Sequence, residues 1–415
     1  MPLPEKPLAI VLGGTHPHVA LIERLKARGY RILLADYLES PPAAAAADEH
    51  ARVSTLAMDD VLALARARKA ALVIATCVDR ANLTAAYVAE RLGLPAPYGF
   101  ATARRIADKL EMKRRLQSLG VPTAEFAVLG DAGAARRCPL PFPVVVKPID
   151  TGGSKGVRKA TDPEQLLLAA EQAFEATRSA EVLVERFLEG VEVSADCLVQ
   201  EGVPQLLLVR RKYVLSGAGG ELLASYASVC PAALSPLADA RIRKAAQDIA
   251  RGFDLRSTPL LVQFIVNGDD VRVIEFAPRV GGGTNYRQVM LQSGVDIVEA
   301  AIDAYLGERT VCSVEPARGY TATSHVYAEP GLFGEIRHHE ELLGEGVVAE
   351  FYIHKARGAS IGPSTSASER VASFIVRGDD AADLLRRTRQ AMQRLEVMDA
   401  GGRSILRREL YLKAL

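Results

Sequence analysis

Two stretches, VVVKPIDTGGSKGV at residues 144–157 and VRVIEFAPRVGGG at residues 271–283, decide the fold that we expect for this chain. The first is an apolar strand that ends in a lysine and continues into a loop of Gly and Ser. The second is another strand, which carries Glu275 and, four residues later, Arg279. A lysine and backbone amides bind phosphates, and a carboxylate binds the magnesium that accompanies them. With an apolar strand that holds Glu185 between them, the two stretches predict a site for phosphoryl transfer.

The composition is that of a globular protein larger than one domain. The chain has 415 residues, 49% of them hydrophobic and 24% charged, and this length predicts two or three domains. The 51 Lys and Arg nearly cancel the 50 Asp and Glu, which argues against a broad surface for nucleic acid or membrane. The five scattered cysteines form no CxxC pair, so we expect neither zinc nor a disulfide framework. No run reaches the ~18 apolar residues of a membrane helix, and we expect a cytoplasmic protein.

Strands and helices alternate over the first hundred residues, which predicts a parallel α/β layer. The expected strands are 8–12, 31–35 and 71–75, and the expected helices are 19–28 and about 80–92. The turn GGTHPH at residues 13–18 lacks the GxGxxG spacing of a dinucleotide fingerprint. The alanine-rich segment 41–50 reads as a surface loop or short helix.

The rest of the chain predicts mixed α/β and α+β structure. One or two helices are expected at 102–119, and a small α/β unit at 124–200 with strands near residues 144, 182 and 193. Further strands are expected near residues 206, 261 and 271 and at 348–354 and 372–376, and helices at 238–252, 296–306 and 381–395.

Four segments in this order resemble the ATP-grasp superfamily, which includes biotin carboxylase, carbamoyl phosphate synthetase, D-alanine ligase and the L-amino-acid ligases. They are DKLEMKRRLQSLGVPT at 108–123, VVVKPIDTGGSKGV at 144–157, VLVERFLEGVEVSAD at 182–196 and VQFIVNGDDVRVIEFAPRVGGG at 262–283. The resemblance implies an N-terminal pre-ATP-grasp α/β domain at 1–100, an ATP-grasp domain at 101–308 with its small lobe at about 124–200, and a C-terminal α+β part at 309–415 that completes the large lobe. The FAPRVGGG stretch and the extra C-terminal part resemble the standalone amino-acid ligases more than biotin carboxylase.

In this superfamily ATP lies between two α+β subdomains. The resemblance assigns to the phosphates Lys109 and Lys147 and a covering loop with Gly152, Gly153 and Ser154. It assigns to the adenine hinge the backbone of Glu185, Phe187 and Leu188, and to the ribose Glu192. A solvated helix lysine is the alternative for Lys109, and a surface acid on a strand is the alternative for Glu192.

The resemblance also assigns a metal site for Mg²⁺, with Mn²⁺ as a substitute. Gln263 and Glu275 stand where the superfamily places metal ligands on adjacent strands. Many members carry Asn two residues after the second acid, where this chain has Ala277. Glu275 must therefore supply a larger share of the metal coordination, or one magnesium ion is weakly bound.

The transferring phosphate and the acyl intermediate are assigned to Arg279, whose fork of donors suits oxyanions. A structural ion pair with Glu275 is the alternative role for this arginine. The candidate substrate contacts are Arg279, Gly282, Gly283, Lys212 and His16.

The resulting hypothesis is an ATP-dependent carboxylate–amine ligase that forms an amide or peptide bond through an acyl phosphate and releases ADP and phosphate. Its partners would be a small-molecule carboxylate and amine, with no nucleic acid or membrane, and a homodimer is left open. A carboxylase or carbamoyl-phosphate-type enzyme that acts on bicarbonate is one alternative. The other is a non-catalytic ATP-binding regulatory protein, which Gln263 and Ala277 keep open.

Overall fold

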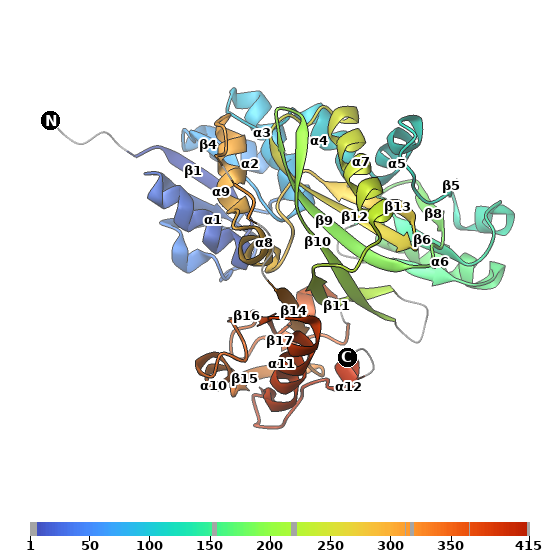
Figure 1. Ribbon diagram of the computed structural model, residues 1–415. Coiled ribbons are helices and arrows are strands. Elements are labelled where there is room, and N and C mark those ends of the chain that lie inside the picture. The colour runs from blue at the N-terminus through green and yellow to red at the C-terminus, as the bar shows by residue number, and fades with distance from the viewer. Residues whose placement is uncertain are drawn as a thin grey trace.

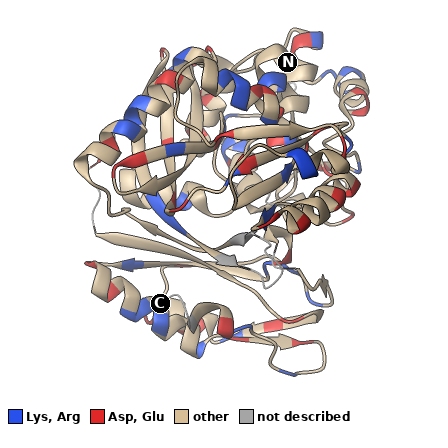
Figure 2. Cartoon of the chain, turned by 90° about the vertical axis from the view of Figure 1, so that its right-hand side faces the viewer, with Lys and Arg blue, Asp and Glu red and all other residues tan. Residues whose placement is uncertain are grey.

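The computed structural model describes residues 6–151, 156–216, 222–311, 313–315, 319–364 and 366–412. It shows an N-terminal α/β unit, a central two-lobed region and a C-terminal unit, coloured from blue through green and yellow to red in Figure 1. This mixed α/β and α+β architecture confirms the predicted fold class. Within the described ranges, no helix is long and apolar enough to span a bilayer. Acidic and basic residues are interspersed over the ribbon in Figure 2.

The N-terminal unit is a parallel sheet in the order β3-β2-β1-β4 with helices around it. Its strands are β1 (Leu8–Leu12), β2 (Arg31–Ala35), β3 (Glu49–Ala51) and β4 (Leu72–Ile74), and its helices are α1 (His16–Ala27), α2 (Met58–Ala67) and α3 (Asp79–Leu92). Every residue of β1 is buried, as expected of a strand covered on both faces. We interpreted segment 41–50 as a loop or short helix. That interpretation was wrong at the end of the segment, because residues 49 and 50 begin β3, an edge strand that pairs with β2.

Helix α1 begins three residues earlier than expected. The Nδ1 atom of buried His18 lies 3.1 Å from the backbone nitrogen of Thr15 and accepts its hydrogen bond, and Pro17 occupies the first turn. A side chain that returns to the first backbone N–H in this way fixes a helix start, as in a capping box. His16 and His18 therefore lie on the first turn of a helix and not in a loop.

The small lobe is an antiparallel sheet in the order β5-β8-β6-β7. Its elements are β5 (Phe126–Leu129), β6 (Val144–Pro148), β7 (Arg158–Ala160), β8 (Val182–Arg186) and the helix α6 (Pro163–Ala176). Two helices, α4 (Phe100–Ala107) and α5 (Lys109–Ser118), precede it. They are separate because the carboxylate of Asp108 accepts hydrogen bonds from the backbone of Leu110 and Glu111 and so caps α5.

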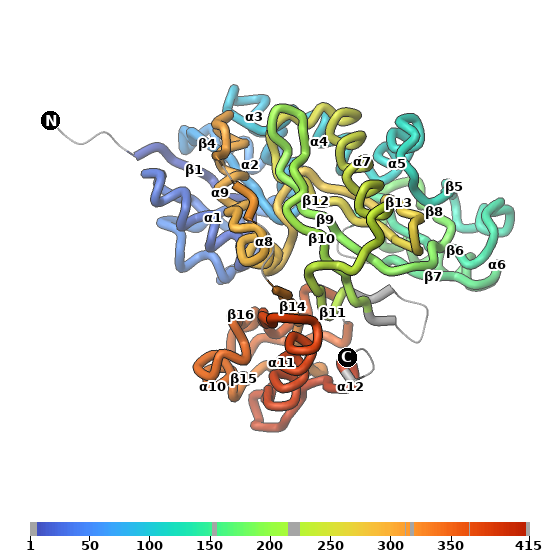
Figure 3. The backbone as a smooth tube through the Cα atoms, viewed as in Figure 1, coloured from blue at the N-terminus to red at the C-terminus, as the bar shows by residue number. Residues whose placement is uncertain are grey.

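An eight-stranded sheet, in the order β13-β12-β9-β10-β11-β14-β18-β16, runs from the central region into the C-terminal unit. Its strands are β9 (Val191–Gln200), β10 (Val203–Ser216), β11 (Leu222–Cys230), β12 (Thr258–Asn267), β13 (Asp270–Ala277), β14 (Tyr320–Val326), β16 (Glu350–Ile353) and β18 (Ala372–Gly378). In Figure 3, β11 reaches from the central region to the C-terminal unit. The strand near residue 193 was expected in the small lobe, but it is β9, which pairs with β10 and β12 of this sheet.

Several helices and a small sheet complete the fold. They are α7 (Pro236–Gly252), α8 (Asn285–Ser293), α9 (Ile297–Leu306), α10 (His339–Gly344), α11 (Ala381–Arg394) and α12 (Glu409–Leu412), with a sheet of β15 (Gly331–Arg337), β17 (Ser360–Ile361) and β19 (Glu396–Asp399). Apolar residues of α9 belong to the same core as the N-terminal sheet.

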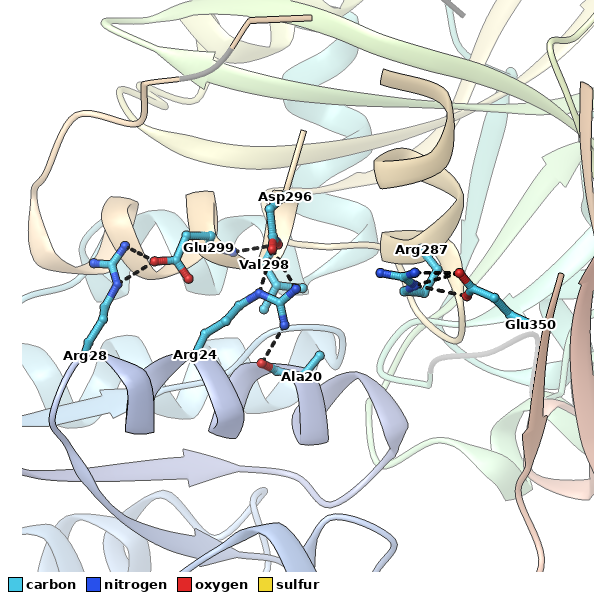
Figure 4. Close-up of polar contacts among 8 residues, drawn as sticks. All are labelled: Ala20, Arg24, Arg28, Arg287, Asp296, Val298, Glu299 and Glu350. Carbon is cyan, nitrogen blue, oxygen red and sulfur yellow. Dashed lines mark hydrogen bonds and ion pairs between the residues drawn. The ribbon is translucent and has the colours of Figure 1, made fainter. Parts of the chain in front are cut away.

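Ion pairs join the parts of the chain at their borders. Figure 4 shows Arg24 of α1 and Arg28, just after α1, bound to Asp296 and Glu299 at α9, while Arg287 of α8 pairs with Glu350 of β16. These contacts and the shared core hold the N-terminal and C-terminal units against the central lobes.

Candidate active site

A cleft of about 490 Å³ lies between the small lobe and the large sheet. The small lobe contributes β6 and β8, and the large sheet contributes β9, β10, β12 and β13. Nine residues predicted for the site line this cleft: Lys109, Lys147, Glu185, Phe187, Leu188, Glu192, Lys212, Gln263 and Glu275. The predicted loop residues Gly152, Gly153 and Ser154 lie outside the described residues. A volume of this size is typical of small-molecule sites.

A buried carboxylate between two lysines forms the floor of the cleft on the small-lobe side. Lys147 Nζ lies 2.6 Å from Glu185 Oε2, and Lys113 Nζ lies 3.0 Å from Glu185 Oε1. Lys113 also donates to Thr123 Oγ1 at 2.6 Å. Burial would raise the pKa of Glu185, but the two lysines outweigh it and lower the pKa to about 2. The structure thus keeps Glu185 ionised and directs the ammonium of Lys147 along the cleft.

Lys113 is a site residue that the sequence analysis missed. It lies on α5 four residues after Lys109, so both lysines occupy the same helix face. Its neighbours Leu110, Met112 and Leu116 are buried, and a lysine among buried positions needs a counter-charge. The spacing of the two lysines was the available signal, because it points both to one side of the helix.

Lys109 binds the segment that leads into the predicted phosphate loop. Its ammonium donates to the carbonyl oxygen of Pro148 at 3.3 Å and to that of Thr151. Burial lowers the pKa of Lys109, and nearby Glu275 partly opposes this effect. The position is at the edge of the cleft and not on a solvated helix surface.

The two candidate metal ligands are direct partners across a pair of strands. Gln263 of β12 lies opposite Glu275 of β13, and Gln263 Nε2 donates to Glu275 Oε1 at 2.8 Å. Lys212 Nζ donates to Gln263 Oε1 at 2.5 Å and to Glu192 Oε1 at 2.6 Å. A polar chain therefore runs from Glu192 through Lys212 and Gln263 to Glu275, along the large-sheet wall of the cleft. Ala277 follows on β13 and is buried.

Arg279 pairs with an acid from the N-terminal unit. Its Nε and Nη2 atoms lie 2.6 and 2.9 Å from the carboxylate oxygens of Asp79, and Nη1 donates to the carbonyl of Val280 at 2.9 Å. The ion pair that we considered with Glu275 is thus formed with Asp79 instead. A second cavity, of about 90 Å³, is lined by both members of this pair and shares Lys109, Gln263 and Glu275 with the larger cleft.

The remaining substrate candidates follow Arg279 or lie on α1, and none of them lines either cavity. Gly282 has open space beside it, since a Cβ there would meet its nearest neighbour, the carbonyl oxygen of Cys77, at 3.9 Å. Gly283 has φ +63°, a conformation that favours glycine. His16 lines neither cavity; its Nε2 lies 2.7 Å from the carbonyl oxygen of Ile353, at the contact with the C-terminal unit.

A cleft between two α+β lobes, with lysines on one wall and strand-borne oxygen ligands on the other, is the arrangement of an ATP-grasp protein. Residues 140–288 match the family model of the ATP-grasp domain, and residues 324–398 match L-amino acid ligase C-terminal domain 2. The chain therefore contains an ATP-grasp domain and a match to the C-terminal domain of the L-amino acid ligases, which confirms the resemblance that the sequence motifs indicated.

Curated relatives of the chain are ligases. Phosphoribosylamine–glycine ligase of Phenylobacterium zucineum is 29% identical over 311 residues, which cover 69% of this chain and 71% of the relative. D-Alanine–D-alanine ligase of Pseudomonas entomophila is 35% identical over 122 residues, which cover 29% of this chain and 38% of the relative. The predicted class, an ATP-grasp ligase, is confirmed.

Solved structures share the whole fold. The L-amino acid ligase from Bacillus licheniformis has a TM-score of 0.79 at 20% identity and covers 95% of this chain and 99% of its own. The biotin carboxylase domain of 2-oxoglutarate carboxylase from Hydrogenobacter thermophilus, whose structure contains MgADP and bicarbonate, has a TM-score of 0.74 at 19% identity, with 96% and 91% covered. At these identities the two structures support the fold alone.

Proposed function

We propose that this protein is a carboxylate–amine ligase that uses ATP to form an amide or peptide bond through an acyl phosphate. The observation that carries the proposal is the continuity of two cavities at Lys109, Gln263 and Glu275. The larger cleft has room and cations for a nucleoside triphosphate. The smaller cavity presents Arg279, which can hold the carboxylate that receives the phosphoryl group.

The lining of the larger cleft supports a nucleotide in the predicted orientation. Lys147 and Lys109 would supply the positive charge that the phosphates need, and Glu192, in the same lining, would bind the ribose hydroxyls. Phe187 and Leu188 line the same cleft and would bring their backbone groups to the adenine edge. The loop with Gly152, Gly153 and Ser154 would supply backbone amides to the phosphates.

The metal candidates fit magnesium that is bound jointly with phosphates. Among the described residues, no three His, Cys, Asp or Glu side chains lie close enough to form a complete metal cage. Magnesium in phosphoryl-transfer sites uses one or two protein oxygens, substrate phosphates and water, so Glu275 and the amide oxygen of Gln263 suffice. When bound, the ion would neutralise charge on the transferring phosphate, and Mn²⁺ would substitute for it.

The chemistry then needs no nucleophilic side chain. A carboxylate oxygen of the acid attacks the terminal phosphorus and ADP leaves, which yields an acyl phosphate. The amine attacks the acyl carbon, the phosphate leaves, and the amine gives up a proton. Arg279, with Gly282 and Gly283 beside it, would stabilise the oxyanion that forms in this step.

The test is a screen of amino acids and small carboxylic acids, singly and in pairs, for ADP and phosphate release, with Lys147→Ala as the inactive control. We expect release only with an acid present and a condensed product only with acid and amine together. With ¹⁸O in the acid carboxylate, one label should appear in the released phosphate. Bicarbonate as the required substrate would favour the carboxylase alternative, and nucleotide binding without turnover would favour a regulatory protein. AMP as the stoichiometric product would refute the mechanism.

A further inference from the structure

An ion pair between the N-terminal unit and the end of β13 is part of the candidate active site. Asp79 is the first residue of α3 and lies 200 residues from Arg279 in sequence. Its two carboxylate oxygens engage Nε and Nη2 of the guanidinium at 2.6 and 2.9 Å. This two-point contact fixes the plane of the guanidinium as well as its distance, which a single hydrogen bond does not do.

The loop that presents Asp79 is itself held in place. The side-chain amide of buried Asn82 donates to the carbonyl oxygens of Thr76 at 3.0 Å and Val78 at 2.9 Å. The hydroxyl of Tyr305, on α9, donates to the amide oxygen of Asn82 at 3.3 Å. These three contacts, two of them buried and one partly buried, brace the backbone just before Asp79, from which its carboxylate reaches the cavity wall.

The contact leaves the outer edge of Arg279 available. A guanidinium has five N–H donors. Asp79 accepts from Nε and Nη2, and the carbonyl of Val280 accepts from Nη1. One donor on each terminal nitrogen is left that no described contact uses, and Arg279 lines the small cavity beside Lys109 and Glu275. Guanidinium donors at the wall of a cavity match a carboxylate or phosphate oxyanion.

The charges around Arg279 explain why this guanidinium needs an acid other than Glu275 beside it. Burial would lower the pKa of Arg279, but Asp79 more than offsets this effect, and nearby Glu275 acts in the same direction. The side chain of Asp79 is 51% exposed; partial loss of solvent would raise its pKa, but Arg279 and Lys109 hold the pKa below its ordinary value. Without Asp79, Glu275 would be the acid left to attract the guanidinium, and Glu275 is the candidate metal ligand.

We propose that Asp79 is a positioning residue for the ligase reaction: it holds Arg279 with its outer donors toward the acid substrate and keeps it away from Glu275. The inference rests on the proposed function. It also means that the N-terminal unit, through α3, completes an active site whose other parts belong to the two lobes.

The experiment compares Asp79→Asn, Arg279→Ala and the double variant in steady-state ADP release with the acid found in the screen. Asp79→Asn keeps the shape of the side chain but removes its charge and one acceptor. We expect kcat to fall about 10- to 100-fold, because a small displacement of a group that contacts the reacting atoms lowers the rate by about this factor. Binding of a nonhydrolysable ATP analogue should change less than about twofold, because Asp79 lines only the small cavity. The double variant should be no slower than Arg279→Ala, since Asp79 acts through Arg279.

Glu299→Gln is the matched control. Glu299 also joins the N-terminal unit to the rest of the chain, through Arg28 at 2.7 Å, but it lies in neither cavity (Figure 4). It should lower the melting temperature without lowering kcat. If Asp79→Asn does not fold, Asp79→Glu replaces it in the same cycle, because it keeps the charge and shifts the guanidinium.

The outcomes separate the inference from the proposed function. If the wild type turns over its acid and the Asp79 variant does so equally fast, or if the losses from the two single variants add in the double variant, the positioning role is wrong. If Glu299→Gln lowers kcat as much as Asp79→Asn does, the effect is one of domain docking and the role is also wrong. If the wild type releases no ADP with any acid, the proposed function fails and the inference fails with it.

Discussion

Replacement of Glu185 by Gln tests the charge arrangement of the cleft most directly. Two buried ammonium groups, on Lys113 and Lys147, depend on this one carboxylate. Its pKa falls from an ordinary 4.5 to about 2, in spite of burial, because of the two lysines. At ~1.4 kcal/mol per pKa unit, the ionised carboxylate contributes about 3 kcal/mol to stability at neutral pH. Leaving buried charges unpaired costs a similar ~3–5 kcal/mol.

Hydrogen exchange of the β6 and β8 amides, read by mass spectrometry, measures this loss locally in a chain too large for two-state unfolding. We expect Glu185→Gln to speed exchange there about 100-fold at neutral pH, which corresponds to ~3 kcal/mol. Lys113→Met should speed this exchange less than Glu185→Gln does, because Glu185 keeps its ion pair with Lys147 at 2.6 Å. The exposed Glu181, just before β8, gives the control Glu181→Gln, which should have no effect.

The stability that Glu185 gives to the small lobe should depend on pH in a definite direction. A carboxyl group with a depressed folded-state pKa stabilises the fold above its unfolded pKa and loses this contribution as the pH falls through the folded value. The small lobe should therefore lose the ~3 kcal/mol between about pH 5 and pH 2, and Glu185→Gln should lack this component. A change of less than twofold in exchange at neutral pH would refute the reasoning about Glu185.

Three further predictions concern the metal, the phosphates and the domain border. Lys147→Ala and Glu275→Ala should each lower ADP release about 100-fold or more with the circular-dichroism spectrum unchanged; near-normal turnover in either would show that the site is misplaced. Ala277→Asn should lower the Mg²⁺ concentration for half-maximal turnover, because it adds an oxygen ligand, and an unchanged metal titration would contradict this. Arg287→Met should lower the melting temperature in calorimetry by about 1–2 °C, because Glu350 loses a two-point partner; an unchanged melting temperature would show that this pair does not stabilise the domain border.

The strands of the site were predictable because their sequences are locally decisive. The run that forms β6 is mainly apolar, and the run that forms β13 mixes apolar and charged residues. Both have strand length and are bounded by turn residues, so periodicity and composition identify them without tertiary information. Periodicity does not tell with which other strands a strand pairs in a sheet. β9 was placed in the small lobe for this reason, although its pairing with β10 and β12 puts it in the large sheet.

The charged partners of the site were less predictable than its strands. Lysine and arginine positions follow from motifs, but the choice of an acid depends on how distant elements pack. Asp79 and Arg279 meet because β4 ends near the end of β13, a relation between two domains. Lys113 is the intermediate case, because its helical spacing from Lys109 was visible in the sequence and only its partner Glu185 was not.

Two cations of the site, Lys147 and Lys212, are each paired with an acid, and these pairs bear on how ATP would bind. Lys147 can contact a phosphate while Glu185 remains at its side, because an ammonium has three donors. Lys212 differs, since it holds both the ribose candidate Glu192 and the metal candidate Gln263. If magnesium bound the amide oxygen of Gln263, like charge would displace the ammonium of Lys212 from that oxygen, while Glu192 could still accept from both Lys212 and a ribose hydroxyl. Binding of ATP with its magnesium would thus free a donor of Lys212 for the incoming acid, which favours binding of ATP before the carboxylate.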